Sequence, residues 1–179
     1  MRHVVVALLL LGAPMVVAEL PEPAAAETVV ETPTPDLLSH TFDSVEEMTR
    51  AALEVVASGD IDALRQLAVT RDEFRDFVWS GLDASRPERN LPWEFVWSQH
   101  ALRHESSLRR IATDFGGQDL EIVSFTARGK TTDHGHFLIH RENYVEVVRP
   151  DGTRDELRLF GSLLETDDGR VKIYSFIND

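Results

Sequence analysis

Three histidines close to one another in the second half of the chain have the types and spacing that metal or acid–base chemistry requires. They are His134, His136 and His140. Residues two apart in a β-strand share a face, so these imidazoles would line one side of a strand over 132–140. Neutral imidazoles at this spacing bind zinc or a similar divalent ion, and Glu121 or Glu146 on a neighbouring strand could supply a carboxylate ligand.

The residues between these histidines favour another interpretation. Phe137 and Ile139 fall on the opposite face of the same predicted strand and have the character of core residues. The histidines would then face solvent, with a metal site or an acid–base role in a pocket as the alternatives. We predict a solvated sheet face, no metal and no other cofactor, and we keep His136 as a candidate ligand-binding residue.

A second group of polar side chains lies in residues 85–93, between two predicted helices, where two prolines restrict the backbone. A guanidinium there offers a planar fork of donors that suits a carboxylate or a phosphate, which would make the segment an anion-binding lip. Alternatively, Arg86 and Glu88 pair with each other and only fix the shape of the connector. We favour the structural interpretation and retain Arg86, Glu88, Asn90 and Trp93 as candidate ligand-binding residues.

The predicted helix after this connector carries a third group. His100 and His104 are four residues apart and therefore share a helix face, which is a possible metal-binding arrangement. The residue after His100 is alanine, whereas the metalloprotease motif has glutamate there. An alternative is that Gln99 and His104 face a pocket beside Trp97, and we keep Trp97 and His104 as candidate ligand-binding residues.

Composition limits the classes of function. The chain has 179 residues and a formal net charge of −13, so phosphate backbones and anionic lipid would repel it, and we predict no nucleic-acid partner. It has no cysteine, which excludes disulfides, thiolate metal ligands and a cysteine nucleophile. Its length corresponds to one domain with extra residues at the amino end.

The amino-terminal sequence predicts export. A basic start, an apolar run over 4–11 and small residues up to Ala18 form the three parts of a signal peptide over 1–18. The run is shorter than the ~20 residues that span a bilayer, so no stable membrane insertion is expected after cleavage. Residues 19–40 contain four prolines and predict a disordered or extended tether. A single domain would follow over 41–179, in the periplasm or secreted.

Within that domain, helical patterns precede strand patterns. Asp43 or Ser44 is predicted to cap the first helix and Asp60 the second, Thr70 and Glu73 form a capping box for a third, and Pro92 lies in the first turn of a fourth that runs to about 115. Strands are predicted at 119–127, 132–140, 143–149, 155–165 and 170–177, with 155–165 in the centre. Their short connections, including a turn at 141–142, predict an antiparallel meander and hence an α+β domain.

The start of this domain resembles a known family. A helix from Val45 that ends in Ser58-Gly59-Asp60, with Ala63-Leu64 after it and a curved sheet later, is similar to the NTF2-like (SnoaL-like) superfamily. The segment over 74–92 also looks like a group of uncharacterised exported bacterial proteins. The resemblance implies a cone in which helices close over a curved antiparallel sheet and leave a pocket. It departs from many members in lacking a short hairpin between the early helices and the long one.

These observations predict a non-catalytic domain that binds a small apolar ligand or an envelope protein, with a homodimer also possible. The expected pocket walls are aromatic: Trp79, Trp93, Trp97, Phe125 and Phe160. The alternative is an isomerase, dehydratase or hydrolase of this superfamily that uses a histidine such as His104 or His136 as general base.

Overall fold

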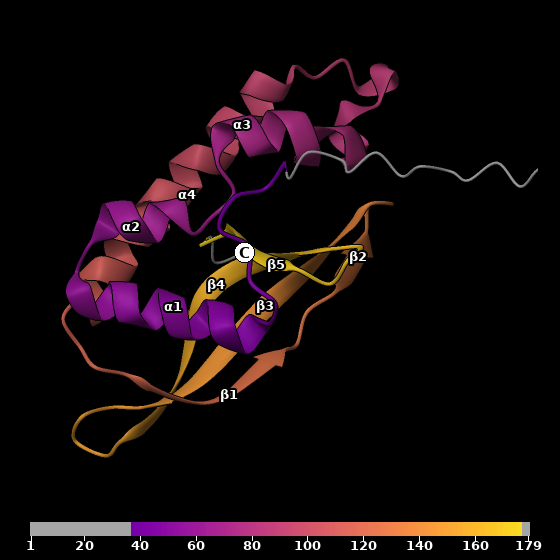
Figure 1. The fold of residues 1–179 in the computed structure, drawn as a ribbon. Helices are drawn as coiled ribbons and strands as arrows, with labels where there is room; N and C mark the ends of the chain where they lie inside the picture. Colours follow the sequence, from indigo (N-terminus) through magenta and orange to yellow (C-terminus); the bar gives the residue numbers. More distant parts are fainter. Residues whose placement is uncertain (1–36, 177–179) are drawn as a thin grey trace, which may run out of the picture. The chain divides into compact units, whose positions relative to one another are not determined.

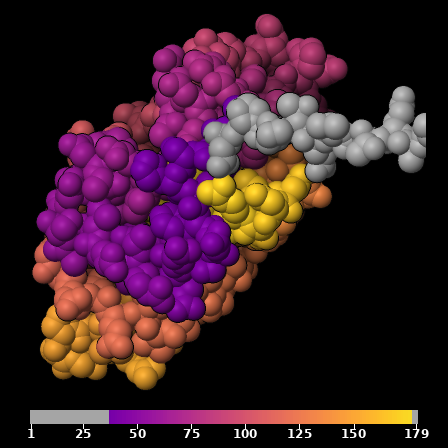
Figure 2. Space-filling view, viewed as in Figure 1, coloured from indigo at the N-terminus to yellow at the C-terminus, as the bar shows by residue number. Residues whose placement is uncertain are grey.

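Helices packed on a curved antiparallel sheet make up the domain in the computed structural model, which describes residues 37–176 (Figure 1). This confirms the predicted α+β fold. The predicted signal peptide and most of the predicted tether lie outside the described residues. In the space-filling view the helices of the first half cover much of the sheet behind them (Figure 2).

The first two helices begin where the sequence predicts, and the first also ends there. Helix α1 (Val45–Ser58) starts after Ser44, whose hydroxyl accepts a hydrogen bond from the backbone N–H of Glu47. It ends at Gly59, whose φ of 73° lies in the left-handed region that glycine enters at little cost. Helix α2 (Ile61–Gln66) is capped in the same way by the Asp60 carboxylate.

The third predicted helix is shorter and less regular than its apolar spacing suggests. Helix α3 (Arg71–Glu73) has the predicted capping box, but the chain continues through a π-helical turn η1 (Phe74–Val78) and a 3₁₀ turn η2 (Trp79–Gly81). Two more 3₁₀ turns, η3 (Asp83–Ser85) and η4 (Pro87–Arg89), form the connector. Helix α4 (Trp93–Phe115) then starts one residue later than predicted, with Pro92 as its N-cap residue.

The sheet differs in two respects from the predicted meander. Its strands are β1 (Glu121–Ala127), β2 (Thr131–Asp133), β3 (Phe137–Val148), β4 (Arg154–Thr166) and β5 (Val171–Ser175). The order is β1-β3-β4-β5, so β4 is an inner strand as predicted, but β1 and β2 both pair with β3.

The predicted turn at 141–142 is wrong, because β3 runs through it as one strand. Glu142 has a φ of 53° and the register with β4 shifts between Asn143 and Val145, so an irregular strand replaces the expected turn. A backbone distortion of this kind produces the same polar interruption in the sequence as a turn does.

Two groups of buried apolar side chains hold the domain together. The larger joins α1, α2 and α4 to the sheet through residues such as Met48, Leu108 and Phe160. The smaller joins Phe74 of η1 to Phe137 of β3 and includes Leu38, which lies within the predicted tether. The start of the described chain therefore belongs to the packed domain.

A buried ion pair lies beside the smaller group. Lys172 of β5 is fully buried, and its ammonium lies 3.1 Å from a carboxylate oxygen of Glu73. The same ammonium donates to the backbone carbonyl of Ser39. Three segments distant in sequence are thus connected at one point.

Candidate functional site

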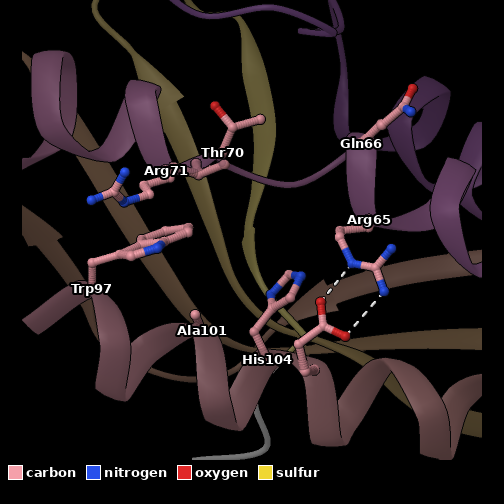
Figure 3. A pocket seen from close by; sticks show the side chains of 9 residues that line it. Arg65, Gln66, Thr70, Arg71, Trp97, Ala101 and His104 are labelled. Atoms are coloured by element: carbon pink, nitrogen blue, oxygen red, sulfur yellow. Dashed lines mark hydrogen bonds and ion pairs between the residues drawn. The ribbon is translucent and has the colours of Figure 1, made fainter. Parts of the chain in front are cut away.

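A cavity of about 220 Å³ opens between the α2–α3 region and α4 (Figure 3). Residues near the end of α2 and the start of α3 form one wall, and one face of α4 forms the other. Figure 3 shows Trp97 and Arg71 on one side, Arg65 on the other, and His104 between them. The lining residues are Arg65, Gln66, Val69, Thr70, Arg71, Trp97, Ala101, His104 and Glu105.

His104 is the buried polar side chain of this lining. It is 6 % exposed, and its Nδ1 accepts a long hydrogen bond of 3.5 Å from the backbone N–H of Phe176. In a neutral imidazole the other ring nitrogen then carries the proton, so Nε2 is a donor. Burial, with a smaller contribution from the charge of nearby His100, lowers the pKa of His104 to about 4. The ring is therefore neutral at physiological pH.

A row of stacked and tilted rings fixes the wall on α4. The ring centroids of Trp97 and Phe74 are 5.3 Å apart, those of Trp97 and His100 5.4 Å, and those of His100 and His104 5.9 Å. The ring centroid of Tyr174 in β5 lies 5.0 Å from that of His100. Such offset and tilted arrangements are favourable for aromatic side chains, so the apolar wall is preformed.

An ion pair closes one side of the cavity. The guanidinium of Arg65 binds the Glu105 carboxylate through two nitrogens, at 2.5 and 3.0 Å, and also pairs with Asp62. The hydrogen bond that Arg65 donates lowers the pKa of Glu105, and the hydrogen bonds that Arg65 donates to Glu105 and Asp62 raise the pKa of Arg65. Both groups remain charged over a wide pH range and connect α2 to α4.

The structure brings only part of the predicted ligand-binding set to this cavity. Trp97 and His104 line it. Trp93 lies one helical turn before Trp97, and the Arg71 guanidinium sits 4.9 Å from its ring centroid. Trp93 thus contacts a lining residue without itself lining the cavity.

The candidates in the connector are placed elsewhere. Arg86 pairs with Asp83 at 2.6 Å instead of Glu88, and both partners are well exposed. Glu88 and Asn90 are exposed, and Asn90 takes a left-handed φ of 48° at the end of η4. None of these three residues lines the cavity, and their arrangement agrees with a connector-shaping role.

The three histidines of the second half do not share a strand face. Residues 134–136 form a turn between β2 and β3, with Gly135 at a φ of 93°, and this places the imidazoles in different surroundings. His134 Nδ1 lies 3.0 Å from the carbonyl oxygen of Gly81, and His136 Nε2 lies 2.9 Å from that of Phe77. The predicted single face is therefore wrong, because glycine after His134 favours a turn.

His140 stands apart from the other two. Its Nε2 is 2.8 Å from a carboxylate oxygen of Glu165, and its Nδ1 is 2.9 Å from the hydroxyl of Thr131. Within residues 37–176 no group of three His, Asp or Glu side chains is placed to hold a metal ion. The structure therefore gives the histidines hydrogen-bonding roles within the fold.

Sequence reasoning missed Arg65, Arg71 and Glu105 as cavity residues. Arg65 and Glu105 are 40 residues apart, so no local pattern connects them. Arg71 had a usable signal, because the capping box of Thr70 and Glu73 fixes it as the first residue of α3. The expected walls Phe125 and Phe160 pack in the larger core instead.

Comparison with known proteins identifies no relative of this chain. No family, no curated protein and no solved structure matches the chain. Among the helices of residues 37–176, none has the length and apolar character that crossing a membrane requires. The cavity and its side chains are therefore the basis for any functional conclusion.

Proposed function

We propose that this protein is a non-catalytic binding domain that holds a small, mainly apolar ligand in the cavity between α2, α3 and α4. The observation that carries the proposal is the lining: Val69, Trp97 and Ala101 provide apolar surface, and one buried imidazole adds a polar contact. Of the other polar lining residues, Arg65 and Glu105 bind each other, and Gln66, Thr70 and Arg71 are exposed. Preformed apolar pockets with few convergent polar groups are the usual form of small-molecule sites.

The volume of the cavity limits the size of the ligand. An enclosed apolar cavity of about 150 Å³ holds a benzene molecule. The present cavity of about 220 Å³ is larger and has an aromatic wall. Two fused rings, or an aliphatic group of similar size, suit this space.

The surroundings of His104 support binding over catalysis. A general base works best with a pKa near the operating pH, whereas the pKa of His104 is lowered to about 4. Its Nδ1 is directed at a backbone N–H and not at a carboxylate that would orient the ring. His136, the other proposed base, contacts the Phe77 carbonyl and does not line the cavity.

The place of action follows from the amino-terminal sequence. We propose that the domain works outside the cytoplasm, because residues 1–18 have the pattern of a signal peptide. We also propose that it is NTF2-like, because its helical start over 45–64 resembles that superfamily. Sequencing the amino terminus of the protein from its natural host tests the first proposal: a start at Glu19 supports export, and a start at Met1 refutes it.

The binding proposal is tested with a neutral probe, 2-naphthamide, measured by isothermal titration and by the shift in melting temperature. Replacement of Ala101 by leucine fills the cavity and should weaken binding at least about tenfold, since a misfit of one carbon group already costs ~10–200-fold. Ser106 is exposed on the same helix, so Ser106→Leu adds comparable bulk outside the cavity and should bind like the wild type.

Equal binding by the Ala101 and Ser106 variants would refute a site in this cavity. Native mass spectrometry of the purified full chain complements the titration. A bound small molecule supports the proposal directly, whereas a homodimer or a co-purified envelope protein without one favours protein binding.

A further inference from the structure

Two arginines line the cavity. They differ in whether a carboxylate of the protein already binds the guanidinium. Arg65 is fully engaged, because it binds Glu105 through two nitrogens and Asp62 through a third contact. All three of its donor nitrogens are thus occupied by carboxylates. It is therefore poorly suited to receive a ligand.

Arg71 is different. Among residues 37–176 its guanidinium has an aromatic contact, 4.9 Å from the ring centroid of Trp93, but no carboxylate or other hydrogen-bond partner. The nearest acidic residue in sequence, Asp72, pairs instead with Arg75 at 3.0 Å, and Asp76 also binds Arg75. A cation with unused donors thus stands at the cavity in a chain of net charge −13.

The contact with Trp93 gives this guanidinium a defined place. A cation over an indole face is attracted by the ring, and the planar guanidinium keeps its edge free for hydrogen bonds. Figure 3 shows Arg71 beside the Trp97 side chain, with the His104 ring further along α4. A planar molecule against Trp97 would have its end near Arg71.

We infer that the cavity takes an aromatic monocarboxylate, with its rings against Trp97 and its carboxylate bound by Arg71. This inference rests on the proposed function and names the ligand class. The fork geometry of arginine matches the two oxygens of a carboxylate. One unpaired cation balances one negative charge. A dianion such as a phosphate monoester is disfavoured, because Glu105 lines the cavity and Asp72 is close in the chain.

The test compares two probes of nearly equal shape, 2-naphthoate and 2-naphthamide, on the full chain by isothermal titration at pH 7. Only the first has a negative charge. The wild type should bind 2-naphthoate about tenfold more tightly, since a charge-assisted hydrogen bond is worth roughly that factor. The preference should shrink when the salt concentration is raised, because the arginine is exposed.

Three variants locate the effect. Arg71→Gln should abolish the preference for the carboxylate, measured as the ratio of the dissociation constants of the two probes, whereas Arg71→Lys should retain part of the preference. Arg110 is exposed on α4 and does not line the cavity, so Arg110→Gln removes the same charge elsewhere and should keep the full preference. Circular dichroism checks that all variants fold.

The outcomes separate this inference from the proposed function. If both probes bind equally and Arg71→Gln changes neither, the carboxylate inference is overturned while the cavity remains a binding site. If neither probe binds the wild type, the proposed function is refuted and this inference with it. An equal loss of preference in Arg71→Gln and Arg110→Gln would show general electrostatic attraction and overturn the role of Arg71.

Discussion

The buried pair of Lys172 and Glu73 leads to the most quantitative prediction about this fold. Lys172 is fully buried and Glu73 is nearly so, with 7 % of its side chain exposed. Removing one partner of such a pair typically costs about 3–5 kcal/mol, because the other charge is left in a poorly solvated place. The two single substitutions should not be equivalent, since the two charges have different remaining partners.

The hydrogen bonds around each charge set the order of the two effects. Without Lys172, the Glu73 carboxylate still accepts from the backbone N–H of Ser39 at 2.6 Å, the Ser39 hydroxyl at 2.8 Å and the Thr70 N–H at 2.7 Å. Without the carboxylate, the ammonium keeps the Ser39 carbonyl as its acceptor. We therefore expect Lys172→Met to cost about 3 kcal/mol and Glu73→Gln about 5 kcal/mol.

Urea denaturation at pH 7, followed by circular dichroism and tryptophan fluorescence, measures both values. The double variant should cost less than the sum of the single ones, because the two side chains are in contact. Lys130 is the only other lysine of the chain and is exposed, so Lys130→Met should change the free energy of unfolding by less than ~0.5 kcal/mol. A cost below ~1 kcal/mol for Lys172→Met, or a smaller cost for Glu73→Gln than for Lys172→Met, would refute the reasoning.

The same pair predicts a pH dependence. Burial alone would raise the pKa of Glu73, but the hydrogen bonds from Thr70 and Ser39 and the charge of Lys172 outweigh burial and lower it below 4.5. A carboxyl with a lowered pKa in the folded state stabilises the fold above its unfolded pKa and loses that effect as the pH falls through the folded value. In Lys172→Met the free energy of unfolding should therefore decrease less steeply as the pH is lowered.

Two further predictions concern the cavity and the 3₁₀ turn η2. The pKa of His104 is lowered from 6.5 to about 4, so as the pH falls the imidazole is protonated in the unfolded chain before it is protonated in the folded protein. The free energy of unfolding should therefore fall by about 3 kcal/mol between pH 6.5 and 4. An NMR titration of the His104 ring with a midpoint near 6.5 would contradict this. Gly81→Ala should cost about 1–3 kcal/mol in urea denaturation, because a Cβ there would lie 2.7 Å from a ring carbon of Phe137; the adjacent Ser80→Ala should be nearly neutral.

Local signals in the sequence predicted the beginnings of the helices well. Ser44, Asp60 and Thr70 each cap the helix that the sequence assigns to them. A capping side chain bonds to N–H groups only two or three residues away, so its effect depends little on the remaining fold. The central position of the strand over 155–165 was also predictable, because its residues are apolar on both faces.

Features that depend on distant residues were not predictable. Glu142 is an example, since a polar interruption that suits a turn proved to be an irregularity within β3. Gly135, in contrast, was a local signal for a turn that the strand predicted over 132–140 did not take into account; β2 ends at Asp133 and β3 begins at Phe137. The rule that residues two apart share a face holds only within an uninterrupted strand. One turn changes the direction of every later side chain. The cavity depends on the distance between α2 and α4, which no residue in either helix determines alone.

Residues 70–73 connect the stability of the fold to the candidate site. Thr70 caps α3 and lines the cavity, and Arg71 is fixed as the first helical residue by that cap. Glu73 completes the capping box while it receives the ammonium of Lys172. The carboxylate that stabilises the core thus also sets the backbone from which the Arg71 side chain extends. The connector contributes from the other side, because α4 begins at Trp93 and presents that ring to the same guanidinium. The position of Arg71 is therefore determined jointly by a buried ion pair and by the start of the long helix.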